Sequence, residues 1–399
     1  MQQNAKATMT TGKSQAKSLL FFAERFPPDL GGVAQSAFRT AKQIAELGWQ
    51  VHVLTWTKTL QPGVLDSSSS HASTDGLSLH RLGLFSNLDL SMQHTINVLE
   101  WLHQQHGFTA AWGHYLYPAG YMAVVFAESV GIASTVSARG NDIDRLMFPP
   151  GDFARLMWTL ERATSISSVS EDLAKKVKVL LGKNPEVDVL LNSVDTEVFC
   201  PSSYSEEVLQ LRQELQIRAE EAVLGFCGEL RHKKGLPFIL SGFAEASRSR
   251  PACLLIIGDV RPRERAHLAT FATEHPEAAE RIIVTGRLES PEEVARHLQV
   301  CDISMQPSVW DGLPNSVLES MACGRIVLAS DAGGIPEVIT HGDDGFLIPK
   351  AQLQHFGTAL LEVLSITQAE KDRVSAAARK KMTEQFNASR EGRRLKRVL

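Results

Sequence analysis

Two carboxylates, Asp311 and Glu319, lie eight residues apart in a segment whose other residues are typical of an anion-binding site. Asp311 lies among turn residues, and Glu319 lies about one turn inside the helix that Pro314 begins. Because Pro314 restricts how the loop enters the helix, both carboxylates can face one cleft. Carboxylates beside an anion site indicate recognition of hydroxyl groups, as on a sugar or a ribose. The alternative is an ordinary solvated acid in a turn or near a helix N-terminus.

The sequence around these acids predicts a loop, a helix, a buried strand and a second helix. The first helix ends near Gly324, and residues 326–329 form a short apolar run of the kind found in parallel sheets. Residues 333–334 are a glycine pair, and residues 336–337 open the next helix. We therefore expect two helix N-termini beside glycine-rich turns at the carboxyl end of a sheet, where anionic ligands bind in open α/β folds.

A basic turn follows another apolar strand. Gly228 ends the run 222–227, and Arg231 and Lys234 follow shortly after it. A glycine turn with basic residues after a strand can bind a diphosphate through backbone N–H groups and cations. A solvated basic turn is the alternative interpretation.

The first half of the chain offers two more candidate positions. Gly31 and Gly32 follow the apolar run 18–23 and precede a helix, so backbone N–H groups there can approach a ligand closely. A plain tight turn is the alternative. His114 ends a predicted strand before a loop, where catalytic groups collect. A histidine that only hydrogen-bonds to the backbone is an equally consistent interpretation.

The stretch 307–337 resembles the signature of the retaining, nucleotide-sugar-dependent glycosyltransferases of family 4, the glycosyl transferases group 1. The family has two acids with this spacing followed by GGxPE, and Asp311 stands where most members have Glu. Residues 138–142 resemble the family's short motif ending Gly-x-Asp, with Arg139 where many relatives have His. Residues 192–199 resemble its linker motif NGVDxxxF. These motifs recur in the family's order.

The resemblance implies the GT-B fold, an α/β architecture in which two doubly wound Rossmann-like domains face a central cleft. The alternation of apolar strands and helical patterns agrees with two parallel sheets. The expected divisions are a disordered tail over 1–17, an acceptor-binding domain over 18–200, a nucleotide-sugar donor domain over 201–378, and a basic helix over 379–399 that packs back on the first domain.

The resemblance also implies retaining transfer of a sugar, such as a hexose, from a nucleoside diphosphate to a hydroxyl of a glycan or lipid-linked acceptor, in polysaccharide or cell-envelope synthesis. The residues expected to act in transfer are Arg231, Lys234, Asp311, Glu319, His114 and Arg139. The residues expected to bind the donor are Gly31, Gly32, Gly228, Arg231, Lys234, Gly286, Asp311, Gly312, Leu313, Asn315, Ser316 and Glu319.

Individual roles follow from the family pattern. Glu319 would bind the ribose hydroxyls, and Asp311 would bind the hexose. Lys234 and the N-terminus of the helix at Asn315 would stabilise the leaving diphosphate. Relatives place an arginine directly after the first glycine of the basic turn, where this chain has Glu229, so Arg231 would supply that charge. We identify no nucleophile, which agrees with the front-face route proposed for the family.

We expect neither a cofactor nor a metal ion at this site. Residues 142–144 match the Asp-x-Asp pattern of a different glycosyltransferase fold, and we interpret them as a loop and a helix start. No other group of histidine, cysteine and acidic residues has metal-ligand spacing in the sequence. Two alternatives remain: a nucleotide-sugar hydrolase or epimerase of the same fold, and a non-catalytic sugar-nucleotide binder. A dinucleotide oxidoreductase is disfavoured because no GxGxxG follows a strand.

Composition limits the partners and the compartment. The net charge of −4 over 399 residues argues against a nucleic-acid-binding protein. The widely spaced cysteines, the lack of a signal peptide and the lack of a long apolar run predict a cytoplasmic protein. The basic residues of 379–399 would bind the protein peripherally to anionic lipid if the acceptor is lipid-linked. A solvated terminal helix is the alternative.

Overall fold

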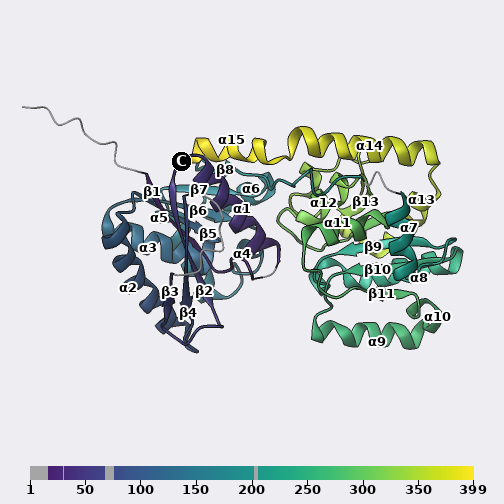
Figure 1. Cartoon of the computed structure of the whole chain (residues 1–399), viewed down its shortest axis with the longest axis horizontal. Helices are drawn as coiled ribbons and strands as arrows, with labels where there is room; N and C mark the ends of the chain where they lie inside the picture. Colours follow the sequence, from purple (N-terminus) through teal and green to yellow (C-terminus); the bar gives the residue numbers. More distant parts are fainter. Residues whose placement is uncertain (1–16, 30, 68–75, 202–204) are drawn as a thin grey trace, which may run out of the picture.

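The computed structural model describes residues 17–29, 31–67, 76–201 and 205–399, and it contains two α/β domains side by side (Figure 1). Each domain has one mainly parallel sheet between helices. Residues 1–16 of the predicted tail lie outside the described residues, whereas Lys17 accepts a hydrogen bond from the Gln50 backbone N–H at 2.8 Å. The fold class expected from the sequence is confirmed.

The first domain contains an eight-stranded sheet in the order β3-β4-β2-β1-β5-β6-β7-β8, in which only β3 runs antiparallel to its neighbour. Its strands are β1 (Ser18–Ala23), β2 (Gln50–Thr57), β3 (Leu65–Asp66), β4 (Leu77–Gly83), β5 (Ala110–His114), β6 (Ala133–Ala138), β7 (Ser165–Ser168) and β8 (Asp188–Val189). Its helices are α1 (Gly32–Glu46), α2 (Leu88–His106), η1 (Leu116–Gly120), α3 (Tyr121–Val130), α4 (Asn141–Asp144), α5 (Pro150–Arg162) and α6 (Glu171–Leu181).

The second domain contains a parallel six-stranded sheet in the order β11-β10-β9-β12-β13-β14. Its strands are β9 (Ala222–Cys227), β10 (Ala252–Ile257), β11 (Ile282–Val284), β12 (Ile303–Gln306), β13 (Ile326–Ser330) and β14 (Phe346–Ile348). Its helices are α7 (Ser205–Glu214), η2 (His232–Lys234), α8 (Leu236–Ser249), η3 (Pro262–Glu264), α9 (Arg265–Glu274), α10 (Pro276–Ala279), α11 (Pro291–Gln299), α12 (Asn315–Ala322), η4 (Ile335–Glu337), η5 (Lys350–His355), α13 (Phe356–Ser365) and α14 (Gln368–Gln385).

Continuous apolar runs form the central strands because both faces of each sheet are covered. In β1, Leu19 and Phe21 pack in a cluster with residues of α1, whereas Leu20 and Phe22 pack in a separate cluster with residues of α2 and α3. All six residues of β1 are buried. This is why the strand shows no alternation of polar and apolar residues.

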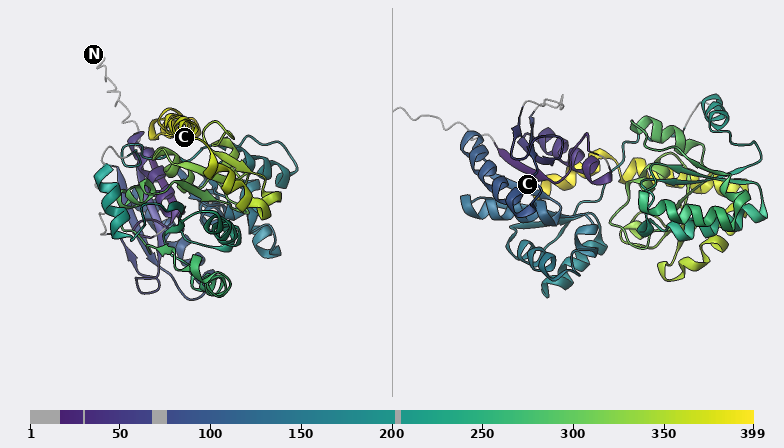
Figure 2. Two further views of the ribbon diagram at one scale, coloured as in Figure 1. Left: turned by 90° about the vertical axis from the view of Figure 1, so that its right-hand side faces the viewer. Right: turned by 90° about the horizontal axis from the view of Figure 1, so that it is seen from below.

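The chain crosses between the domains twice, once after β8 and again between α14 and α15 (Ala388–Val398). Figure 1 shows α14 along the second domain and α15 reaching the first, and the right-hand view of Figure 2 shows this C-terminal segment extending between the two domains from below. The two crossings meet where the Val194 backbone N–H donates to the Phe386 carbonyl at 2.8 Å. The predicted division between residues 378 and 379 falls inside the continuous helix α14.

The side chains of Glu391 and Leu395 connect α15 to the first domain. Leu395 is buried in the cluster that contains Leu19 and Phe21. The Glu391 carboxylate accepts a hydrogen bond from Arg39 Nε of α1 at 2.8 Å. Among the described residues, no helix is long and apolar enough to cross a membrane.

Candidate active site

The loops at the carboxyl ends of the two sheets meet at a pair of glycines, Gly140 after β6 and Gly312 after β12. A Cβ atom on Gly140 would lie 2.9 Å from the Gly312 nitrogen, and one on Gly312 would lie 2.4 Å from the Arg139 carbonyl oxygen. The φ of Gly140 is +121°, a conformation that side chains disfavour. The domains therefore touch backbone to backbone at the glycine of the Gly-x-Asp motif.

The N-termini of α1 and α12 also face each other across this contact. A Cβ atom on Gly32 would lie 3.6 Å from Asn315 Nδ2, and the preceding Gly31 has a φ of +101°. Asn315 Oδ1 is buried and has no hydrogen-bond partner in the described part of the chain. The Ser316 hydroxyl, in contrast, donates to Gln306 Oε1 at 3.0 Å. The predicted donor-binding glycines of the first domain thus lie beside the predicted donor helix of the second.

One predicted element is wrong. The sequence predicted a helix after Gly333 and Gly334, but the structure has only the short 3₁₀ turn η4 there. A Cβ atom on Gly333 would lie 1.9 Å from the Asp311 carbonyl oxygen, so this glycine packs directly under the loop that precedes α12. The segment supports that loop and does not present a second helix N-terminus.

Asp311 and Lys234 form an ion pair between the loops that follow β12 and β9. The Gly312 backbone N–H donates to Asp311 Oδ1 at 3.1 Å. Burial alone would raise the pKa of Asp311, but the charges of Lys234 and Lys233 outweigh burial and keep that pKa below its ordinary value. Asp311 is therefore an ionised carboxylate that already has a cation beside it.

Glu319 is half-buried within α12, and no hydrogen bond to its side chain exists among the described residues. Burial raises the pKa of Glu319 to about 7, and the positive charge of Arg39 offsets only part of that effect. A carboxylate without a partner in such a place is suited to accept hydrogen bonds from ligand hydroxyls.

Arg231 is paired with Glu229. The same carboxylate accepts a hydrogen bond from Arg261 Nε at 2.8 Å. Burial would raise the pKa of Glu229, but the hydrogen bond from Arg261 and the charge of Arg231 lower it below the ordinary value. Glu229 stands where the family has an arginine, and we expected Arg231 to supply the missing positive charge. The pairing with Glu229 neutralises that charge.

Three glycine turns lie together at the carboxyl edge of the second sheet. A Cβ atom on Gly258, after β10, would lie 2.5 Å from the Gly228 carbonyl oxygen, after β9. Gly258 also pairs with Gly286, which follows β11 and has a φ of +68°. The structure thus groups the predicted donor-binding positions Gly228 and Gly286 on one edge.

His114 is fully buried beneath the first turns of α1. Its Nε2 lies 3.0 Å from the Ser36 hydroxyl, and its Nδ1 has no partner in the described residues. Burial, with repulsion from Arg139 and Arg39, lowers the pKa of His114 well below its ordinary value. The ring is therefore neutral, and Ser36 of α1 covers its Nε2 nitrogen.

Arg139 contacts the linker between the domains. Its Nη2 donates to Asn192 Oδ1 at 2.8 Å, and Arg39 donates to the same oxygen at 3.1 Å. Asn192 Nδ2 in turn donates to the Leu313 carbonyl at 2.9 Å. Burial, with repulsion from Arg39, lowers the pKa of Arg139 to about 10, so the guanidinium stays charged at neutral pH. Asn192 thereby joins the cations of the first domain to the donor loop.

The Asp-x-Asp segment is a loop and helix start, as predicted. The buried Asp142 carboxylate accepts hydrogen bonds from the backbone N–H groups of Arg139 at 3.0 Å, Gly140 at 2.8 Å and Leu116 at 3.1 Å. Asp144 pairs with Lys176 at 2.7 Å. Asp142 therefore fixes the loop that carries Arg139 and Gly140.

The sequence interpretation missed a contact made by Glu337, the last residue of the GGxPE motif. Its carboxylate accepts hydrogen bonds from the backbone N–H groups of Glu171 at 2.9 Å and Asp172 at 3.1 Å, so it caps α6 of the first domain. Lys233 makes a second bridge by donating to Asn141 Oδ1 at 2.8 Å. The motif itself was visible in the sequence, but its partner helix lies in the other domain.

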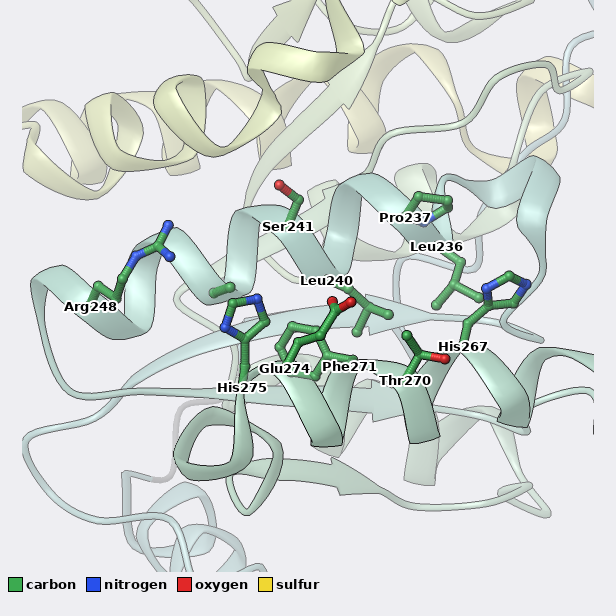
Figure 3. A pocket seen from close by; sticks show the side chains of 11 residues that line it. Leu236, Pro237, Leu240, Ser241, Arg248, His267, Thr270, Phe271, Glu274 and His275 are labelled. Atoms are coloured by element: carbon green, nitrogen blue, oxygen red, sulfur yellow. The ribbon is translucent and has the colours of Figure 1, made fainter.

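A groove of about 340 Å³ lies elsewhere, between α8 and α9 of the second domain. Figure 3 shows Leu240 and Phe271 inside it, with Arg248 and His275 at one end and His267 at the other. None of the predicted site residues lines this groove. The candidate active site at the strand-end loops is therefore separate from this groove.

Two family models match this sequence. Residues 31–193 match the model described as "Glycosyl transferase 4-like domain", and residues 221–365 match "Glycosyl transferases group 1". Together these matches cover most of the chain.

Curated relatives match along nearly the whole chain. The N-acetyl-α-D-glucosaminyl L-malate synthase of Bacillus anthracis is 23% identical over 91% of this chain and 92% of that protein. A GDP-mannose-dependent monoacylated α-(1-6)-phosphatidylinositol monomannoside mannosyltransferase of Corynebacterium glutamicum is 22% identical over 97% of this chain and 98% of that protein.

Solved structures share the fold. HepE of Anabaena, solved with UDP and glucose, has a TM-score of 0.78 and 16% identity, and covers 96% of this chain and 99% of its own. The sucrose-phosphate synthase of Thermosynechococcus elongatus has a TM-score of 0.78 and 14% identity, and covers 96% of this chain and 98% of its own. These likenesses confirm the arrangement of two Rossmann-like domains that the sequence predicted.

Proposed function

This chain belongs to the group 1 glycosyltransferases of the GT-B fold, and from that premise we propose that it is a retaining enzyme that moves a hexose from a nucleoside diphosphate to an acceptor hydroxyl. The observation that carries the proposal is the convergence of Lys234, Asp311 and the N-terminus of α12 beside Gly32. Relatives whose names or structures include UDP, glucose or GDP-mannose support a nucleotide-sugar donor.

Donor binding would exchange the partners of Lys234. The diphosphate carries more charge than one carboxylate, so Lys234 would move from Asp311 to the diphosphate oxygens. The backbone N–H groups of Asn315 and Ser316, at the N-terminus of α12, would donate hydrogen bonds to the same oxygens. Asp311 would then be free to accept hydrogen bonds from hexose hydroxyls. Glu319 would accept hydrogen bonds from the ribose hydroxyls. Lys234 and the N–H groups at the N-terminus of α12 would also stabilise the negative charge that develops on the leaving diphosphate.

The proposed route is front-face transfer. The bond between the anomeric carbon and the diphosphate oxygen breaks, and the acceptor oxygen bonds to that carbon from the same side, so the configuration is retained. The leaving phosphate takes the proton of the acceptor hydroxyl. The route needs no metal ion at the diphosphate, because Lys234 and the N-terminus of α12 supply the positive potential there.

The acceptor would bind the first domain across the cleft from the donor loops. A glycan or lipid-linked acceptor of polysaccharide or cell-envelope synthesis is the class we propose. The five cysteines are free thiols, which supports a reducing compartment such as the cytoplasm.

The exposed face of α15 supports peripheral contact with anionic lipid. Arg390, Arg393, Lys396 and Arg397 are exposed, whereas Glu391 and Leu395 face the first domain. Each such cation near an anionic surface contributes about 1 kcal/mol. We expect binding to phosphatidylglycerol vesicles at low salt and release at high salt. An Arg393→Gln/Lys396→Gln variant should bind less, and no binding at low salt by the natural sequence would refute the contact.

Thermal unfolding in the presence of UDP, GDP, ADP and their sugars, with and without EDTA, tests the donor site. A ligand that binds only the folded protein must raise the melting temperature. We expect one nucleotide to raise it, EDTA to leave that shift unchanged, and Glu319→Ala to abolish the shift. Loss of the shift in EDTA would overturn the metal-free site, and no shift with any nucleotide would overturn the transferase proposal.

Product analysis separates the transferase from its alternatives. Incubation with the identified donor and a panel of glycan and lipid-linked acceptors should give a glycoside with the anomeric configuration of the donor. Free sugar or an epimerised donor as the main product would favour a hydrolase or an epimerase. Donor binding without turnover on any acceptor would favour a non-catalytic binder.

A further inference from the structure

Three histidines from separate elements of the first domain meet away from the strand-end loops: His52 of β2, His80 of β4 and His106 at the end of α2. The Nδ1 of His52 lies 3.2 Å from the Nε2 of His80. The rings of His52 and His106 stack with their centroids 4.0 Å apart. One ring nitrogen from each histidine lies within 4.8 Å of the other two.

Strand register explains why these rings share one face of the sheet. In the parallel pair of β2 and β4, Leu54 lies opposite His80, and His52 is two residues before Leu54. Residues two apart on a strand, and residues directly opposite across a pair, point to the same face. Leu54 packs with Leu99 of α2 in one cluster, so this is the face that α2 covers, and His106 is the last residue of that helix.

The surroundings of the cluster suit a cation bound by neutral imidazoles. His52 and His80 are buried, and burial with repulsion from His106 lowers the pKa of each to about 4, so both rings are uncharged at neutral pH. The Ser67 hydroxyl lies 2.8 Å from Nδ1 of His80, the outer contact that commonly orients a metal-binding histidine. His106 is exposed, which leaves a path for an ion and a water ligand.

We propose that His52, His80 and His106 bind a divalent transition-metal ion, with zinc as the natural occupant. Two histidine nitrogens bound tetrahedrally to zinc lie about 3.4 Å apart, because each zinc–nitrogen bond is about 2.1 Å long. The separation of 3.2 Å between His52 Nδ1 and His80 Nε2 matches that requirement. Three imidazoles select the zinc, nickel and copper class over magnesium or calcium, which prefer oxygen ligands.

The ion would stabilise the fold and take no part in sugar transfer. His52 lies near the start of β2, whereas the candidate active site follows the carboxyl ends of the strands. A bound ion would connect β2, β4 and the end of α2, so its binding free energy would add to the stability of the first domain. Spacing along the sequence could not reveal this cluster, because each ligand comes from a different element.

A second cluster in the other domain provides a matched control. His232, Glu264 and His267 also bring their potential ligand atoms within 4.8 Å of one another. However, Arg263 Nε already lies 2.9 Å from the Glu264 carboxylate, and its positive charge opposes a metal ion there. His267 is therefore a histidine in a similar cluster that we expect not to bind the metal.

The experiment uses the full chain without a histidine tag, stripped with a chelator and titrated with Co²⁺ and then Zn²⁺. We expect one ion per chain by calorimetry, a visible d–d absorption from bound Co²⁺, and a higher melting temperature with Zn²⁺. His106→Ala removes an exposed ligand without disturbing the core and should weaken binding by at least about tenfold, as should Ser67→Ala. His267→Ala should bind as the natural sequence does.

Equal Zn²⁺ affinity in the natural sequence and in His106→Ala would overturn the proposal. Loss of binding in His267→Ala, with retention in His106→Ala, would overturn it too and would assign the ion to the second domain. A His52→Asn variant that folds, as judged by circular dichroism, yet gains no thermal stability from Zn²⁺ would support it independently of catalysis.

Discussion

Lys234 and Asp311, from loops that follow different strands of the second sheet, form an ion pair. A diphosphate that binds at α12 must therefore compete with Asp311 for the ammonium group. The pair keeps the lysine positioned and keeps the carboxylate ionised, and it must open for both groups to reach a donor.

Asp311→Asn should separate nucleotide binding from sugar transfer. Removing the competing carboxylate should tighten binding of the free nucleoside diphosphate by roughly fivefold, the equivalent of about 1 kcal/mol for a partly exposed ion pair. Transfer should fall, because hydrogen bonds from hexose hydroxyls to a charged acceptor contribute about 1.5–3 kcal/mol. Calorimetry with the nucleotide and kcat/KM for the nucleotide sugar measure the two effects.

The exposed Asp343→Asn removes one negative charge away from the site and is the matched control. Weaker nucleotide binding in Asp311→Asn than in this control would contradict competition for Lys234.

Donor affinity should rise with pH through the pKa of Glu319. Burial raises that pKa to about 7 in the free protein, whereas hydroxyl donors favour the ionised form, so binding should release a proton. Below about pH 7 the affinity should fall by up to tenfold per pH unit, and above it the affinity should be constant. Calorimetry with an intact nucleotide sugar measures the donor affinity as a function of pH. The range from pH 5.5 to 8.5 extends roughly one and a half units on either side of the Glu319 pKa.

Glu319→Gln cannot ionise and should bind the donor weakly but with a flat pH profile. An unchanged slope in this variant would assign the released proton to another group.

Glu337→Ala should loosen the contact between the domains. Loss of a helix cap costs about 0.5–2 kcal/mol, and here the cap joins α6 of the first domain to the second domain. We expect a lower melting temperature and a larger radius of gyration by small-angle X-ray scattering. The exposed Glu362→Ala removes the same group from a helix surface and should change neither quantity. A radius identical in both variants would show that the cap does not keep the domains together.

Gly140→Ala should impair transfer more than stability. The added Cβ would lie 2.9 Å from the Gly312 nitrogen, so the loops after β6 and β12 could not approach as they do. Gly342→Ala is the control, because Gly342 also has a positive φ, of +80°, but nothing lies within 4 Å of the added atom. Both should lose about 1–2 kcal/mol of stability from strain. Only Gly140→Ala should lose activity, and equal kcat/KM values in the two variants would contradict a role for this contact.

Local patterns predicted the elements well. The apolar runs 18–23 and 222–227 are β1 and β9 with the same bounds, because a strand buried on both faces needs an unbroken apolar sequence. The helix predicted to begin at Pro314 is α12, which begins one residue later, at Asn315, and ends at Ala322. The prediction of a helix after Gly334 was wrong, because a proline and an acid also suit a single 3₁₀ turn.

Long-range pairings were beyond prediction. The sequence placed His114 at the end of a strand, but it did not indicate that Ser36 would cover the ring. Glu229 was recognised as a departure from the family, yet its pairing with both Arg231 and Arg261 depends on how the turns after β9 and β10 approach each other. Such contacts depend on tertiary geometry that spacing along one chain does not encode.

The return of α15 to the first domain has a consequence for the order of folding during synthesis. Leu395 and Glu391 belong to the interior of that domain, yet the ribosome produces them after every strand of the second sheet. Domains usually complete their folding from the N-terminus onward. Here the second domain can finish first, while the first keeps Arg39 and an apolar surface uncovered until α15 emerges. The first domain therefore completes its core only after the second domain has been synthesised.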